Sequence, residues 1–232
     1  MNYIFMIAMV ILLLSIIIGG IRGLVKTFFA AFSVIIALFI ASQVGPYVGK
    51  VVQKTPVYTG IVSQIQSKLD KQTENTAEKV SEQIETIHGY PIPEFLKDAL
   101  IENNNSQIYE ALGISSFNQY VASYMACLII NAVSFLIIFI LGFIIIKIIE
   151  ISLDLISKLP VLNVMNTLGG VVCGFVHGMM ILWILGVIIT VFSWTELGQY
   201  IALQINENSI LRFIYSHNYL VSTLTNMGKM LF

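Results

Sequence analysis

The placement of charged residues constrains this chain more than any other feature. Four long stretches contain no Asp, Glu, Lys or Arg, and they cover residues 1–21, 27–49, 111–146 and 159–195. Each is at least as long as the ~20 residues that a helix needs to cross the hydrocarbon core of a bilayer. The continuous apolar runs lack the in/out alternation that a transmembrane barrel strand requires. The sequence therefore predicts an all-α, polytopic integral membrane protein with four transmembrane helices.

The remaining charges gather in one segment and divide the chain. Charged residues make up 11% of the sequence, against about 25% in soluble domains, and 15 of them lie between residues 46 and 122. The net charge of −1 and the absence of a basic stripe exclude nucleic acid as a partner. We expect four regions: a transmembrane helix pair in 1–45, a helical insert in 46–120, a second pair with an amphipathic link in 121–194, and an amphipathic tail in 195–232.

The positive charges next to the apolar stretches predict the orientation. Arg22 and Lys26 follow the first stretch without an acidic neighbour, and Lys147 and Lys158 lie between the third and the fourth. Loops rich in Lys and Arg remain on the cytoplasmic side. We therefore expect both links in the cytoplasm, with the termini and an extracytoplasmic insert on the outer side.

Short amphipathic patterns recur outside the apolar stretches. Apolar residues have helical spacing in 61–69, 80–87 and 95–100, and 103–106 has the composition of a loop. Ser116 and Gln119 fit a capping box that starts the third transmembrane helix. We predict a helical cap for the insert, and we expect the tail segments 210–215 and 220–224 to lie on the outer leaflet.

Small residues at four-residue spacing predict where helices pack closely. Apolar side chains gain little by leaving lipid for another helix, so close backbone approach is a main source of packing energy in a bilayer. Such rows occur on three of the expected helices, and their members are Gly19 and Gly23, then Ser33, Ala37, Ala41 and Gly45, then Gly170, Gly174 and Gly178.

The rows do not identify their partners. We favour packing of the helix-two row against the helix-four row within one chain over a contact between subunits. Gly186 lies nearer the outer end of helix four, where we expect local tilting to absorb an added side chain.

Three polar residues interrupt the apolar stretches. An ionisable group inside a membrane helix is a functional candidate by default, so His177 could accept a proton or contact a transported species. The simpler interpretation, which we favour, is a neutral imidazole bonded to a neighbouring helix. Asn131 and Asn166 are predicted to form hydrogen bonds between helices.

The sequence contains no pattern for catalysis or for a bound metal. Cys173 and His177 supply two ligands at most, and zinc requires three or four. No Ser/His pair, carboxylate pair or HExxH motif is present. We expect no catalytic residue, no cofactor and no metal, and hence a protein that is not an enzyme.

Two stretches resemble the colicin V production protein family, also called the CvpA family. The first is the turn GGIRGLVK at 19–26. The second is Leu159-Pro160 followed by NTLGG at 166–170, with Gly174 and Gly178 beyond it. The resemblance covers both helix pairs but not most of the insert, and neither motif is catalytic. It implies a bacterial cytoplasmic-membrane protein linked to the production or export of a toxin peptide and to envelope physiology.

Two functions from different classes remain open at this stage. In the first, a non-enzymatic membrane protein assists toxin-peptide production, export or envelope assembly. In the second, the chain is a subunit of a homo-oligomeric channel or transporter, with the glycine face of helix four lining a pore. The expected partners are the lipid bilayer and either further copies of the chain or other envelope membrane proteins.

Overall fold

The prediction of an all-α fold with four membrane-length helices is confirmed by a computed structural model, which describes residues 2–72, 79–152 and 164–225. The four long apolar helices are α1 (Tyr3–Arg22), α2 (Leu24–Gln53), α7 (Phe117–Ser152) and α8 (Val164–Val191). Each is long and apolar enough to cross a membrane. Their outward side chains are mostly large and hydrophobic, as lipid-facing helices require.

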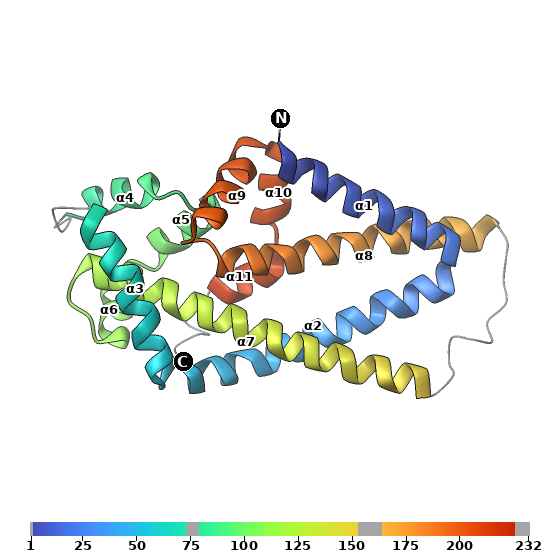
Figure 1. The fold of residues 1–232 in the computed structure, drawn as a ribbon, viewed down its shortest axis with the longest axis horizontal. Coiled ribbons are helices and arrows are strands. Elements are labelled where there is room, and N and C mark those ends of the chain that lie inside the picture. Colours follow the sequence, from blue (N-terminus) through green and yellow to red (C-terminus); the bar gives the residue numbers. More distant parts are fainter. Residues whose placement is uncertain (1, 73–78, 153–163, 226–232) are drawn as a thin grey trace.

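The four helices form two pairs. α1 lies alongside α8, and α2 packs across α7 (Figure 1). The turn from α1 to α2 lies at the same end of the molecule as the end of α7 and the start of α8 (Figure 1). The insert and the tail lie at the opposite end. Arg22 lies in the last turn of α1, and Lys147 lies five residues before the end of α7. Both therefore lie near the end of the bundle that holds the turn from α1 to α2, whereas Lys158 lies outside the described residues.

The second helix is longer than predicted. α2 continues through Pro46 to Gln53, so residues 46–53 extend the membrane helix and do not start the insert. Proline lacks an N–H and normally disturbs a helix, but α2 does not end at Pro46. Within a bundle, neighbouring groups compensate for the lost bond, and the buried Gly45 and Gly49 on either side of Pro46 bring α2 against α7.

Short helices make up the insert and the tail. The insert contains α3 (Pro56–Gln72), α4 (Val80–Gly89), α5 (Glu94–Glu102) and α6 (Ser106–Leu112), and the tail contains α9 (Glu196–Glu207), α10 (Ser209–Ser216) and α11 (Tyr219–Thr225). The expected loop after 102 separates α5 from α6. The predicted cap of α7 is present, since the Ser116 hydroxyl accepts from the Gln119 N–H at 3.4 Å. The link that follows α7 lies outside the described residues.

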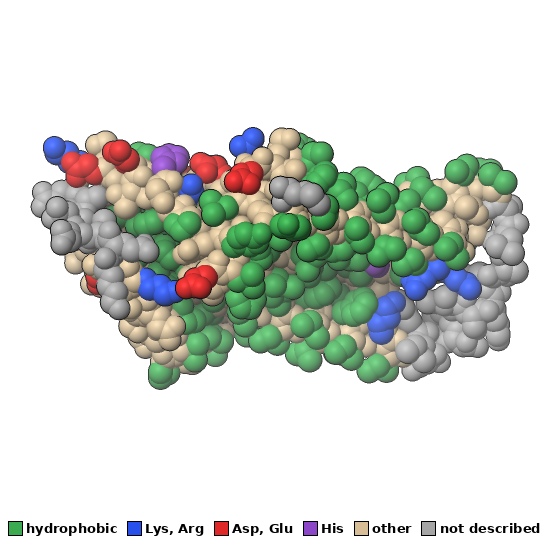
Figure 2. Space-filling model, turned by 45° about the horizontal axis from the view of Figure 1, so that its top comes forward, with side chains coloured by type: hydrophobic (Ala, Val, Ile, Leu, Met, Phe, Trp, Pro, Cys, Tyr) green, Lys and Arg blue, Asp and Glu red, His purple; other side chains and the backbone are tan. Residues whose placement is uncertain are grey.

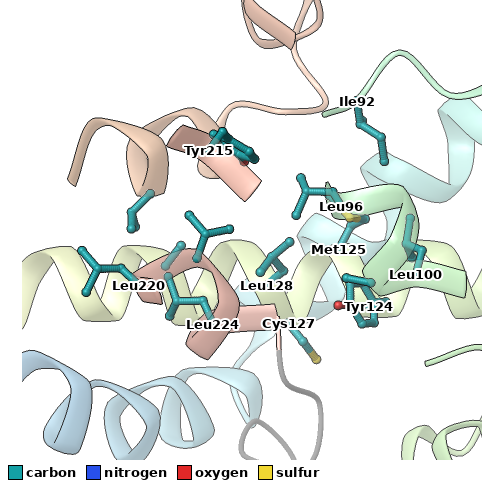
Figure 3. Close-up of a cluster of buried hydrophobic side chains, with 14 of the residues drawn as sticks. Ile92, Leu96, Leu100, Tyr124, Met125, Cys127, Leu128, Tyr215, Leu220 and Leu224 are labelled. Carbon is teal, nitrogen blue, oxygen red and sulfur yellow. The ribbon is translucent and has the colours of Figure 1, made fainter. Parts of the chain in front are cut away.

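The main core surrounds the first turns of α7. Every residue from Tyr120 to Leu128 is almost fully buried. The first part of α7 is therefore enclosed by protein on all sides. Figure 3 shows its side chains beside Leu96 and Leu100 of α5 and Leu220 of α11. The Tyr120 hydroxyl donates to the Leu100 carbonyl at 2.6 Å, which satisfies a polar group inside this apolar cluster.

The tail is part of this core, which corrects the expectation that it lies on the outer leaflet. Val221 of α11 is fully buried, and Leu220 and Leu224 nearly so. The Tyr124 hydroxyl donates to the Thr225 carbonyl at 2.9 Å. A short amphipathic helix presents the same apolar face to lipid and to protein, so the sequence pattern alone did not reveal that this face packs on α7 and α8.

Contacts also join the insert to the tail. The Asn206 side chain accepts from the Glu94 N–H at 3.2 Å and donates to the Ile92 carbonyl at 3.3 Å. The Tyr90 and Trp194 rings meet edge to face, with centroids 5.4 Å apart. On the face shown in Figure 2, acidic side chains gather over this end of the molecule, and hydrophobic side chains cover most of the long helices.

Candidate functional site

The glycine row of α8 packs against α1 at backbone distance. A Cβ added at Gly174 would lie 3.1 Å from the Cα atoms of Gly19 and Ile16 and would overlap the Ser15 carbonyl oxygen. A Cβ at Gly170 would overlap the Gly19 carbonyl oxygen in the same way. Gly178 continues the row against the Ser15 side chain. We call this interface the α1–α8 contact, and only glycine fits at its centre.

Asn166 closes this contact at the turn between α1 and α2. Gly23 has a φ of +80°, which side chains rarely adopt, and the Asn166 amide occupies the space that a Cβ at Gly23 would fill. The Thr27 hydroxyl donates to the Gly19 carbonyl at 3.2 Å and ties α2 to the same turn. The two sequence motifs, 147 residues apart when counted from Gly19 to Asn166, therefore form one packed junction.

The small-residue row of α2 faces α7, so the predicted pairing of helix two with helix four through these rows is wrong. A Cβ at Gly45 would lie 3.2 Å from the Phe135 Cα, and one at Gly142 would lie 3.9 Å from the Ala37 Cα. Ser33 and Ala41, the other members of the row, are also buried. Both the α2 row and the α8 row nevertheless pack within one chain, on α7 and α1 respectively.

Gly186 is also more restricted than expected. A Cβ there would meet the Asn218 amide nitrogen at 2.5 Å. That amide donates to the Trp183 carbonyl at 2.8 Å, and its oxygen accepts from the Leu220 N–H at 3.0 Å. Gly186 therefore lies under a fixed side chain of the tail, where tilting of α8 provides no free space.

His177 lies on α8 and is half-buried. Its Nδ1 atom is enclosed without a hydrogen-bond partner among the described residues, so the predicted bond to a neighbouring helix is not present at this atom. Cys173 and Cys127 are both free. Within the described ranges no three His, Cys, Asp or Glu side chains gather as metal ligands would.

Asn131 marks a second candidate site, a cavity of about 570 Å³ that we call the lateral cavity. Residues of α2, α7, α8 and α11 line it. Its deeper wall is apolar and buried, and it consists of Leu38, Phe135, Met180, Leu220 and Leu224. Exposed aromatic side chains stand at its mouth, which are Phe39, Tyr47 and Tyr219.

Several polar groups of this cavity lack partners. Both amide atoms of Asn131 and the Trp183 Nε1 are buried without a hydrogen bond among the described residues. Ser42 also lines the cavity, and its carbonyl loses its usual helical donor because Pro46 has no N–H. Few buried polar groups remain unsatisfied in native proteins, and each requires an explanation. Asn131 therefore does not form the interhelical hydrogen bond that the sequence suggested.

Partial signals for this cavity are present in the sequence. Gly49 follows Gly45 at the same four-residue spacing, and a Cβ at Gly49 would overlap the Asn131 Oδ1. Pro46 is a helix-disturbing residue inside the charge-free stretch 27–49, and Lys50 is the first charged residue after it. Their meeting with Asn131 and Trp183 required the packing of separate helices.

Tyr90 is a perturbed titratable group outside the membrane helices. Burial raises the pKa of its hydroxyl to about 12, and the Oη atom has no hydrogen-bond partner in the described part of the chain. Tyr90 packs on Trp194, far in sequence from either candidate site. The ring contact joins the insert to the segment that follows α8.

A family model with the description Colicin V production protein matches residues 6–75 and 111–218, which is most of the chain. The matched ranges include most of α1, the whole of α2, α7 and α8, and both parts of the α1–α8 contact. No curated protein and no solved structure matches the chain.

Proposed function

The chain belongs to the colicin V production protein family, and we propose that it is a multi-pass protein of the bacterial cytoplasmic membrane that assists the production or export of a toxin peptide, or envelope assembly, without catalysing a reaction. The family match carries the link to toxin production. The four membrane-length helices support the location. The non-enzymatic role is supported by the two candidate sites, which present backbone contacts and a cavity but no nucleophile paired with a base.

The geometry of α8 argues against the channel alternative in the form considered above. A pore lined by the glycine face requires this face to be open to water or to a second subunit. Gly170, Gly174 and Gly178 are instead buried against α1. The face is already occupied within one chain, so the small residues stabilise the fold.

We also propose that the insert and the tail lie outside the cytoplasm. Arg22, Lys26 and Lys147 belong to the end of the bundle opposite to them (Figure 1). Cationic residues beside membrane helices favour the cytoplasmic side. The contacts between the insert and the tail support a shared location for both.

An export assay tests the proposal. In a bacterium that produces a colicin V-type peptide, the gene for this chain is disrupted, and secreted and cell-retained toxin are measured by immunoblot. We expect less secreted toxin after disruption and recovery with the wild-type chain. Gly142→Ala serves as a matched variant that should also restore secretion, because its Cβ meets neighbours only at ordinary contact distance. Unchanged total and secreted toxin after disruption would contradict the proposal.

A further inference from the structure

We propose that the lateral cavity binds one anionic membrane lipid, with its headgroup at Lys50 and an acyl chain along Leu38 and Phe135. This site does not depend on the export role proposed above. It rests on the volume and apolar walls of the cavity and on the position of one lysine.

The cavity has the composition of a binding site. Its volume of about 570 Å³ lies within the ~300–1,000 Å³ of typical ligand pockets, which combine apolar walls with a few polar groups. Asn131 is 3% exposed, and its amide has both a donor and an acceptor free of protein partners among the described residues. Its oxygen lies against Gly49, so the amide shapes the deep end of the cavity and the charged contact for a ligand is at Lys50.

Lys50 supplies the charge at one end. It lines the cavity, is half-buried, and forms no ion pair or hydrogen bond with the described residues. Leu38 lies twelve residues earlier on α2, which is about 18 Å along the helix. The cavity is thus elongated, with a cation towards the insert and an apolar wall towards the middle of the bundle. An anionic amphiphile has this polarity and this length.

One other occupant fits less well. A water-soluble anion would have to pass the mouth, where Phe39 is 66% exposed on a membrane-length helix. Entry from the lipid phase is the route that this mouth offers.

Trp183 provides a direct reporter, because it lines the cavity and is one of only two tryptophans. The full-length Trp194→Phe protein, in which Trp183 is the remaining tryptophan, is reconstituted in phosphatidylcholine vesicles. The vesicles contain a small fraction of either dibrominated phosphatidylglycerol or dibrominated phosphatidylcholine, since bromine quenches nearby tryptophan fluorescence. We expect stronger quenching by the anionic lipid at equal fraction.

The preference should depend on the charge of Lys50. In the same background, Lys50→Gln should reduce the preference for the anionic lipid about fivefold, which is the value of one lysine near an anionic lipid surface. Lys50→Arg keeps the charge and should keep the preference, which also shows that a changed residue at this position still folds. Lys54→Gln, one turn later and outside the cavity, should leave the preference unchanged.

Each other outcome would overturn the proposal. Equal quenching by the two lipids would mean that the cavity does not select for charge. An equal loss of preference in Lys54→Gln and Lys50→Gln would assign the selection to general surface charge. Relief of quenching by inorganic phosphate would mean that the site takes a free anion and not a lipid.

Discussion

Replacing Gly174 by alanine adds one methyl group at the centre of the α1–α8 contact. The added Cβ would overlap the Ser15 carbonyl oxygen and would lie 3.1 Å from two Cα atoms of α1. All three are backbone atoms, so no side chain can rotate away, and the two helices must move apart. The change therefore tests whether this contact holds the bundle together.

The expected loss follows from two opposing effects. Overpacking of a tight interface costs ~1–3 kcal/mol, and replacing a helical glycine by alanine returns up to ~1 kcal/mol through helix propensity. We expect Gly174→Ala to lower the free energy of unfolding by about 1–2 kcal/mol on balance. Gly142→Ala makes the same chemical change in α7, where the nearest atoms lie 3.9 Å or more from the new Cβ, so it should be neutral or stabilising.

The assay is the midpoint of thermal aggregation in detergent, with crosslinked oligomer yield recorded in parallel. A loss of 1 kcal/mol corresponds to about 2–4 °C in soluble chains of this size, so the two variants should differ by several degrees. If Gly174→Ala matches Gly142→Ala, the close contact does not govern stability and the reasoning is wrong. Loss of oligomer with an unchanged midpoint would place the contact between subunits.

Three further outcomes follow from the extramembrane end of the molecule. Tyr90→Phe removes a buried hydroxyl without a described partner, so it should be neutral or stabilising near pH 7. Burial raises the pKa of Tyr90 to about 12 from an ordinary 10. The contribution of the neutral hydroxyl to the free energy of unfolding is therefore fully present below pH 10 and is lost as the pH rises through 12. Melting midpoints measured over this range should fall less in the phenylalanine variant than in the wild type. Asn218→Ala should lower the melting midpoint more than Asn208→Ala. Each change removes a helix N-cap, but only Asn218→Ala also breaks the hydrogen bond to the Trp183 carbonyl of α8. Equal losses would contradict the importance of that hydrogen bond. Ser67→Cys and Ser222→Cys, both exposed, should react with an impermeant thiol reagent on intact cells, and protection of either until lysis would reverse the orientation.

Much of the fold was predictable because lipid imposes simple rules on a sequence. A helix that satisfies its own backbone is one of few structures that can cross a bilayer, so four charge-free stretches predicted the four long helices. The capping box at Ser116 and the glycine row of α8 were also readable, since both depend on residues a few positions apart. The continuation of α2 through Pro46 was not, because the compensating contacts with α7 come from residues far along the chain.

The pairing of the helices could not be derived from the small-residue rows. The row at Gly170 and the row at Ser33 offer similar bare surfaces, and either could meet any helix that comes close enough. The Asn166 amide against Gly23 and the Asn218 amide against Gly186 select one arrangement, since each fills a space that only glycine leaves. The apolar faces of α10 and α11 were equally ambiguous between lipid and protein.

The sequence by itself determined the helical class, the membrane-length segments and the positions where backbones can approach, because these depend on local hydropathy and on the absence of side chains. Only the tertiary structure decided that α8 packs on α1, that the tail encloses α7, and that Asn131, Trp183 and Lys50 share one cavity. The physical reason is that contacts between helices depend on shape and on polar groups brought together from separate segments, and neither is encoded in the pattern of any one segment.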